Sequence, residues 1–307
     1  MIELPTSASA RSGRGESVMS VILRSGPFAA KVREKGAELS SLADLSTGRE
    51  YIWNGDPAWW TGSAPVLFPI VGALRGGSYT FEGKSYSLPN HGFARGSEFT
   101  IVEERESSVQ LQLASSPKTL EVYPFDFTLR VGFTLQPDGL SVSYLVTNTG
   151  ARRMYFSIGS HPAFVVPFAG GSLENYYVLF DEEESAERWF IRDNLIVADT
   201  TERAFTTRRT IDLSRTLFDR GALVLKHPLS RVFSLRTSFG PQAVTVSTEG
   251  APFLGIWSKP GAAFVCIEPW HGISDSTKAT GVLQEKEGIL FLDPLGTFST
   301  GYRVTIA

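Results

Sequence analysis

Hydrophobic and polar residues alternate in short runs along most of the chain, and this period of two predicts half-buried β-strands. The clearest case is a predicted hairpin whose arms, 127–135 and 140–146, flank Pro137-Asp138-Gly139. In its first arm, Leu129 and Val131 occupy alternate positions. Turns rich in Gly and Pro separate further predicted strands at 18–24, 28–33, 79–81, 86–88, 99–103, 109–114, 154–158, 176–180, 232–235, 243–247, 253–257, 264–267, 289–292 and 302–306.

Helical patterning is sparse, and the main candidate is the short segment 213–220. Many short strands joined by Gly and Pro turns predict an all-β fold, either an antiparallel β-sandwich or a barrel. No linker divides the chain, so we expect residues 18–307 to form one domain. Residues 1–17, which are rich in Ser, Ala, Gly and Arg, are expected to be a disordered extension.

Composition narrows the possible partners and the compartment. The formal net charge of -3 shows no basic excess, so neither nucleic acid nor an anionic membrane is expected as a partner. No apolar run approaches the ~20 residues that span a bilayer, and the N-terminus lacks the apolar region of a signal peptide. The single cysteine, Cys266, is expected to be a small buried residue rather than a nucleophile. These features predict a cytoplasmic protein.

Three ionisable residues occur in unusual contexts. Glu268 is expected to close an apolar strand, where partial desolvation would raise its pKa toward that of a base. His161 follows a predicted strand that Pro162 ends, and an unperturbed imidazole can donate a proton at neutral pH. His91 precedes Gly92, which permits a close backbone approach or a left-handed turn. Each also has a structural interpretation, a salt-bridged glutamate or a hydrogen-bonded core histidine.

Other chemistries find less support. His91, His161 and Glu268 are zinc-ligand types, but no HxH or HExxH pair arranges two of them locally, so no metal is expected. No glycine-rich strand-to-helix loop and no GxSxG segment is present, so neither a nucleotide cofactor nor a hydrolytic triad is expected. Arg95 could bind an anion or a sugar hydroxyl, or form a surface salt bridge.

Aromatic side chains are plentiful near these residues, and flat apolar rings suit the C–H faces of sugars. Most are expected in the core, with one or two forming a stacking platform, and Phe164 and Trp270 are predicted to contact substrate. The candidates are Trp53, Trp59, Trp60, Phe68, Phe93, Phe164, Trp257 and Trp270.

Six segments stand out in order along the chain: GAELSSL (36–42), EYIWNG (50–55), PVLFPIVG (65–72), HGFAR (91–95), HPAF (161–164) and CIEPW (266–270). Together they resemble the aldose 1-epimerase, or galactose mutarotase-like, family over about 18–307, and most of all its bacterial branch linked to lactose or galactose operons. The resemblance implies a large antiparallel β-sandwich, the supersandwich. It also implies that Glu268 is the base, that His161 protonates the ring oxygen, and that His91 helps to hold that oxygen.

The resemblance implies a free aldohexose, such as galactose or glucose, as substrate, with Glu268 and His161 facing each other across the width of one pyranose. Relatives usually carry an arginine where this chain has Ala73, so the predicted substrate contact passes to Arg75 or is lost. Two alternatives stay open, a hexose-6-phosphate 1-epimerase using Arg75 and Arg95, and a catalytically silent sugar-binding protein. Monomer and homodimer also both stay open.

Overall fold

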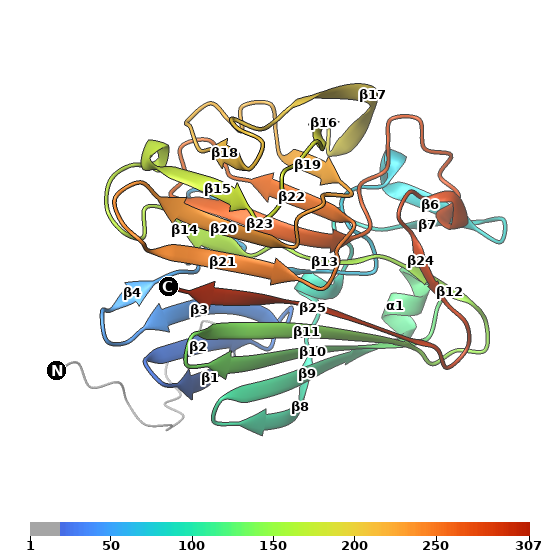
Figure 1. The fold of residues 1–307 in the computed structure, drawn as a ribbon. Helices are drawn as coiled ribbons and strands as arrows, with labels where there is room; N and C mark the ends of the chain where they lie inside the picture. The colour runs from blue at the N-terminus through green and yellow to red at the C-terminus, as the bar shows by residue number, and fades with distance from the viewer. Residues whose placement is uncertain (1–18) are drawn as a thin grey trace.

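The structure is a computed structural model that describes residues 19–307 (Figure 1). The extension predicted at 1–17 lies outside the described residues. Two large sheets dominate the molecule, and every strand pair within its sheets is antiparallel. The all-β prediction is confirmed, whereas the extent of the single predicted domain stays a prediction.

The nine-stranded sheet grows outward from the predicted hairpin. In it, Gln136 pairs with Gly139, so Pro137 and Asp138 form the tight turn. Alternate residues of the first arm, including Leu129 and Val131, are buried, as the sequence pattern requires. In spatial order the strands are β18 (Thr210–Asp212), β15 (Tyr176–Phe180), β20 (Val232–Thr237), β21 (Ala243–Thr248), β25 (Thr297–Ile306), β11 (Gly139–Asn148), β10 (Phe127–Gln136), β9 (Ser108–Ala114) and β8 (Thr100–Arg105).

The eight-stranded sheet carries the predicted chemical residues. Its β23 has two partners on one side, because β14 pairs with the first part of β23 and β13 with the last part. The strands in order are β17 (Leu195–Arg203), β16 (Glu187–Arg192), β19 (Leu223–Lys226), β22 (Phe253–Trp257), β23 (Phe264–His271), β13 (Ile158–Ser160) and β5 (Val66–Leu67), with β14 (Ala163–Val165) beside β23.

Smaller elements complete the fold. Figure 1 shows the N-terminal strands beside β10, which β1 and β2 both contact although they are far from it in sequence. This sheet comprises β1 (Ser20–Ser25), β2 (Phe28–Arg33), β3 (Glu38–Asp44) and β4 (Arg49–Glu50). Two strand pairs are β6 (Ser78–Phe81) with β7 (Lys84–Ser87), and β12 (Met154–Phe156) with β24 (Leu290–Leu292). The helical elements are α1 (Pro117–Val122), η1 (Arg75–Gly77), η2 (Ala94–Gly96), η3 (Leu173–Asn175) and η4 (Leu283–Glu285).

The helix predicted at 213–220 is wrong. That segment forms successive turns, in which Leu217 N donates to Ser214 O and Asp219 N donates to Thr216 O. Its Ser, Thr and Asp side chains favour turns over helix interiors. The helix that does form, α1, begins at a capping box between Ser116 and Thr119.

The main hydrophobic core draws on both large sheets, since it includes Leu129 and Val131 of β10 together with Val265 and Ile267 of β23. Because strand residues alternate between faces, Phe264, Cys266, Glu268 and Trp270 of β23 lie on the face of the eight-stranded sheet turned away from that core. Two smaller clusters cover parts of this outer face. Within residues 19–307, no helix has the length and apolar character needed to cross a membrane.

Candidate active site

Glu268 lies on the outer face of β23, and its residue is 1% exposed. The prediction that it closes the strand is wrong, because β23 continues through Pro269 to His271. Proline has no N–H to give to a ladder, but Pro269 stands where the neighbour of β23 changes from β14 to β13. That break in the ladder lets the strand carry a proline and leaves a gap beside Glu268.

His161 occupies this gap, because it lies in the two-residue link between β13 and β14. As predicted, it follows a strand directly. The residue is 8% exposed, and its Nε2 lies 3.2 Å from Oε2 of Glu268. Two residues more than a hundred positions apart thus meet because both flanking strands pair with β23.

His91 lies next to His161, with their ring centroids 5.7 Å apart. Its backbone has a φ of 65°, a left-handed conformation that is uncommon for residues other than glycine. Gly92 also has a positive φ, and a Cβ there would lie 2.3 Å from the carbonyl oxygen of Phe68. The glycine therefore meets both predicted needs, a left-handed turn and a close approach.

Backbone contacts fix the protonation of His91. Gly72 N donates to His91 Nδ1 at 3.1 Å, while His91 N donates to Gly72 O at 2.8 Å. Since Nδ1 accepts, the proton of the neutral ring is on Nε2. Burial, with a smaller contribution from Arg95, lowers the pKa of His91 to about 3. His91 is therefore a neutral hydrogen-bond donor at physiological pH.

The pKa values of Glu268 and His161 are both strongly shifted. Burial raises the pKa of Glu268 well above its ordinary value, as predicted, and the Trp270 side chain opposes this only partly. Burial, followed by the neighbouring His91, lowers the pKa of His161 well below 6.5. The expectation of an ordinary histidine pKa is thus wrong. Burial thus favours the uncharged form of each group, a protonated Glu268 beside a neutral His161.

Two polar atoms of this pair are left without partners. Among the described residues, neither Oε2 of Glu268 nor Nδ1 of His161 has a hydrogen-bond partner, although both atoms are buried. The 3.2 Å approach of His161 to Glu268 is therefore close in distance without being a well-formed hydrogen bond. Unpaired buried polar atoms are costly, so they are expected mainly where a ligand completes them.

Two tryptophan rings pack against His161. The rings of Trp60 and Trp257 lie 4.8 and 5.6 Å from the His161 ring, centroid to centroid. Trp60 also lines an open groove of about 520 Å³, so the site lies beside a solvent-filled recess. Among the aromatic candidates, these two indoles are placed to form the expected stacking platform. The sequence offered no signal that separated them from the other six.

The two aromatic residues predicted to contact substrate differ in placement. Phe164 is fully buried in the main core, because alternation along β14 turns it away from the face that carries Ala163. Phe164 is therefore a core residue, and we do not include it in the proposed substrate site. Trp270 lies on the correct face beside Glu268, and hypothetical Cβ atoms at Gly159 and Gly255 would lie 2.7 and 2.5 Å from its ring.

The two predicted arginines differ in placement. Arg95 is exposed and lines the 520 Å³ groove together with Trp60, and its charge acts on both His91 and His161. The Arg75 guanidinium instead donates to the carbonyl of Ala279 at 3.1 Å, on the surface. Substrate binding by either arginine stays a prediction.

A set of possible metal ligands exists within the described residues. The ligand atoms of His161, Cys266 and Glu268 lie within 4.8 Å of one another, and all three residues are buried. These donor types suit Zn²⁺. Burial and then Glu268 raise the pKa of the Cys266 thiol, however, which works against the thiolate that zinc needs. Cys266 is a free, buried cysteine, as predicted.

The predicted spacing of one pyranose between Glu268 and His161 is wrong, because the two side chains touch. A sugar cannot lie between them, but ring opening does not require that. The hydroxyl and ring oxygens that exchange protons are both bonded to the anomeric carbon. Neighbouring acid and base groups can therefore reach both oxygens of a pyranose lying over the pair.

Sequence reasoning missed a second buried pair, formed by Asp275 and Lys286. Asp275 follows β23 in a polar loop, a weak signal at best, and nothing local distinguishes Lys286 from a surface lysine.

Comparison with known proteins shows the family of this chain. The family model for aldose 1-epimerase matches residues 19–283. The chain is 31% identical to the plasmid-borne protein LacX of Lactococcus lactis over 298 residues, which cover 94% of this chain and 99% of that protein.

Solved structures extend the likeness to the whole fold. A galactose mutarotase related enzyme from Lactobacillus acidophilus shares 34% identity with a TM-score of 0.88, covering 94% of this chain and 97% of the other. A galactose mutarotase-like protein from Lactobacillus casei shares 28% identity with a TM-score of 0.88, covering 94% and 100%. The chain belongs to the aldose 1-epimerase family.

Proposed function

We propose that this protein is an aldose 1-epimerase that interconverts the α and β anomers of a free aldohexose, using Glu268 and His161 as its acid–base pair. The observation that carries the proposal is the 3.2 Å contact between two buried titratable groups, each with a buried atom that has no hydrogen-bond partner in the described part of the chain. A structural pair would have these atoms satisfied, whereas an acid–base pair leaves them for substrate.

The chemistry needs one proton on the pair. In the reactive arrangement, the Glu268 carboxylate removes the proton of the C1 hydroxyl while the His161 imidazolium protonates the ring oxygen. The bond between C1 and the ring oxygen breaks, and the aldehyde forms. Rotation about C1–C2 and reversal of both proton transfers then close the ring with the other configuration at C1. Glu268 and His161 end with the protons they began with, so no cofactor is consumed.

Burial of both groups shapes this cycle. The resting arrangement, protonated Glu268 beside neutral His161, contains the same single proton as the reactive ion pair. Only a shift of that proton across the 3.2 Å contact separates the two arrangements. Neither carries net charge into the buried site, which keeps the cost of reaching the reactive form low.

His91 would serve as a fixed donor. Its Nε2–H faces away from Gly72, and the ring stays neutral at working pH, so it can donate a hydrogen bond to the ring oxygen or a neighbouring hydroxyl. A donor that needs no reorientation during reaction stabilises developing charge efficiently. Trp60 and Trp257 would stack on the sugar.

Anomer exchange followed by NMR or polarimetry tests the proposal. Wild type should equilibrate the anomers of glucose or galactose, and Glu268→Gln or His161→Ala should each slow turnover at least about a hundredfold. Glu184→Gln is a matched control, because Glu184 is a buried glutamate whose oxygens accept from the backbone of Leu229 and Ser230. Tight sugar binding without exchange in wild type would instead favour a silent binding protein.

One observation supports a second candidate, a hexose-6-phosphate 1-epimerase. The groove beside Trp60 is lined by Arg33, Lys35 and Arg95 against one carboxylate, Glu38. Such a surplus of positive charge suits a phosphate. Comparing kcat/KM for glucose and glucose 6-phosphate decides between them, and Arg95→Met should lower the value for the phosphorylated sugar much more than the value for glucose.

A further inference from the structure

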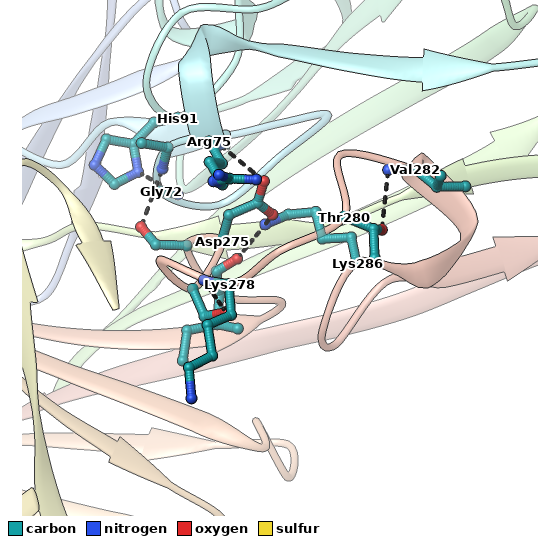
Figure 2. Close-up of polar contacts among 12 residues, drawn as sticks. Gly72, Arg75, His91, Asp275, Lys278, Thr280, Val282 and Lys286 are labelled. Atoms are coloured by element: carbon teal, nitrogen blue, oxygen red, sulfur yellow. Dashed lines mark hydrogen bonds and ion pairs between the residues drawn. The ribbon is translucent and has the colours of Figure 1, made fainter. Parts of the chain in front are cut away.

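A buried ion pair lies behind the candidate active site and has no part in the proposed chemistry. Lys286 Nζ lies 2.9 Å from Oδ1 of Asp275, and the side chains are 2% and 3% exposed (Figure 2). Lys286 also donates to the carbonyl of Ile273 at 2.6 Å. Buried ion pairs are seldom the most stable way to fill a space, so a role in specifying geometry has to be considered.

The free oxygen of this carboxylate holds a neighbouring loop. Oδ2 of Asp275 accepts from Arg75 N at 2.9 Å, and Asp275 N donates to Ala73 O at 2.8 Å. Ser274 Oγ accepts from Ala73 N at 3.0 Å. We call residues 72–75 the strap, because these three bonds tie it to Ser274 and Asp275.

The strap's first residue contacts His91. Gly72 uses its N–H on His91 Nδ1 and its carbonyl on His91 N, as Figure 2 shows. The same glycine is pressed against the loop behind it, since a Cβ there would lie 1.8 Å from Ser274 Oγ. A displacement of the strap would therefore change both the orientation and the tautomer of the His91 ring.

We infer that Asp275, oriented by Lys286, is a positioning residue that acts through the strap to hold His91 with its proton on Nε2. The chain of contacts runs from Lys286 to Asp275, to the backbone of Arg75 and Ala73, and through Gly72 to the imidazole. Its catalytic consequence rests on the proposed function, but the state of the His91 ring does not.

Two double variants isolate the carboxylate oxygen. D275A/K286M and D275N/K286M both remove the two charges without leaving either unpaired. Only the second keeps an oxygen that can accept from Arg75 N. Lys278→Met is the matched control, because Lys278 is on the same loop but its side chain pairs with Asp199 on the surface.

The readout is the imidazole of His91 in long-range ¹H–¹⁵N spectra, which are simple because the chain has only four histidines. In wild type, in D275N/K286M and in Lys278→Met, we expect a single tautomer protonated on Nε2, because Gly72 N donates to His91 Nδ1. In D275A/K286M we expect mixed tautomers, because the strap has lost the carboxylate oxygen that holds Arg75 N.

Turnover gives a second readout, with kcat expected to fall about ten- to a hundredfold in D275A/K286M and KM to change less. A folded D275A/K286M with a single Nε2–H tautomer of His91 would overturn the inference. If that variant does not fold, Ser274→Ala removes one strap bond without touching a charge and should also loosen the ring. An unchanged His91 spectrum in Ser274→Ala would count equally against the strap. Should wild type show no anomer exchange, the proposed function fails while the spectra still decide the positioning role.

Discussion

Two buried acid–base pairs are linked to His91, and they are built in opposite ways. His161 and Glu268 touch at 3.2 Å, but each leaves one atom without a hydrogen-bond partner among residues 19–307. Lys286 and Asp275 touch at 2.9 Å, and both carboxylate oxygens of Asp275 are engaged. The two pairs are alike in burial and distance, and they differ in whether their remaining polar atoms form hydrogen bonds. That difference indicates different roles.

The difference predicts opposite responses to mutation. A satisfied buried pair stabilises its surroundings only while both partners remain, since losing one leaves an uncompensated charge. A pair with unpaired buried atoms already lowers the stability of the folded protein. Replacing one of its members should therefore reduce activity rather than stability.

The largest expected effect is on stability. Lys286→Met should lower the free energy of unfolding by about 3 to 5 kcal/mol, because Asp275 stays buried without its cation. Urea titration monitored by tryptophan fluorescence measures this. Lys278→Met, which breaks an exposed pair, should change it by no more than about 1 kcal/mol. Equal losses of stability in both variants would contradict the claim that the buried Lys286–Asp275 pair stabilises the fold more than an exposed pair does.

Next comes Glu268→Gln, where turnover should fall at least about a hundredfold while the melting temperature stays the same or rises. The reason is that an amide removes the basic group but also removes a carboxyl whose ionisation burial opposes. Thermal unfolding and anomer exchange on the same preparation supply both values. A large loss of stability would identify Glu268 as a structural residue.

The pH dependence of kcat/KM is a finer test. Activity should be lost above the raised pKa of Glu268, where the pair loses its only proton, and below the lowered pKa of His161, where it gains a second. The active range should therefore span neutrality on a broad plateau. Groups with their ordinary values of 4.5 and 6.5 would instead give a narrow maximum between those values, and that profile would contradict the assignment.

The smallest effect concerns metal. EDTA should leave anomer exchange unchanged, and added Zn²⁺ should inhibit only weakly by binding His161, Cys266 and Glu268, because the raised pKa of Cys266 opposes formation of the thiolate. Cys266→Ala should keep the activity without zinc and weaken inhibition at least about tenfold, since loss of a ligand exceeds the usual cost of an outer-shell change. Inhibition that is unaltered in this variant would place zinc elsewhere.

Much of the fold could be predicted because its signals are local. Alternation set the strands of the β10–β11 hairpin, and turn residues set their ends. Prediction fails where tertiary pairing overrides a local signal. The sequence predicts a strand that ends at Glu268, yet pairing with neighbouring strands continues β23 to His271. Residues 213–220 show the converse, since an apolar pattern did not overcome turn-forming side chains.

By itself the sequence determined the all-β class, the family, and the choice of His91, His161 and Glu268 as chemical candidates. Only the tertiary structure decided that His161 touches Glu268, that Phe164 faces the core, and that Lys286 holds Asp275 beneath the strap. The physical reason is that composition and period act over a few residues. Contact, burial and unsatisfied hydrogen bonds depend instead on which distant strands become neighbours.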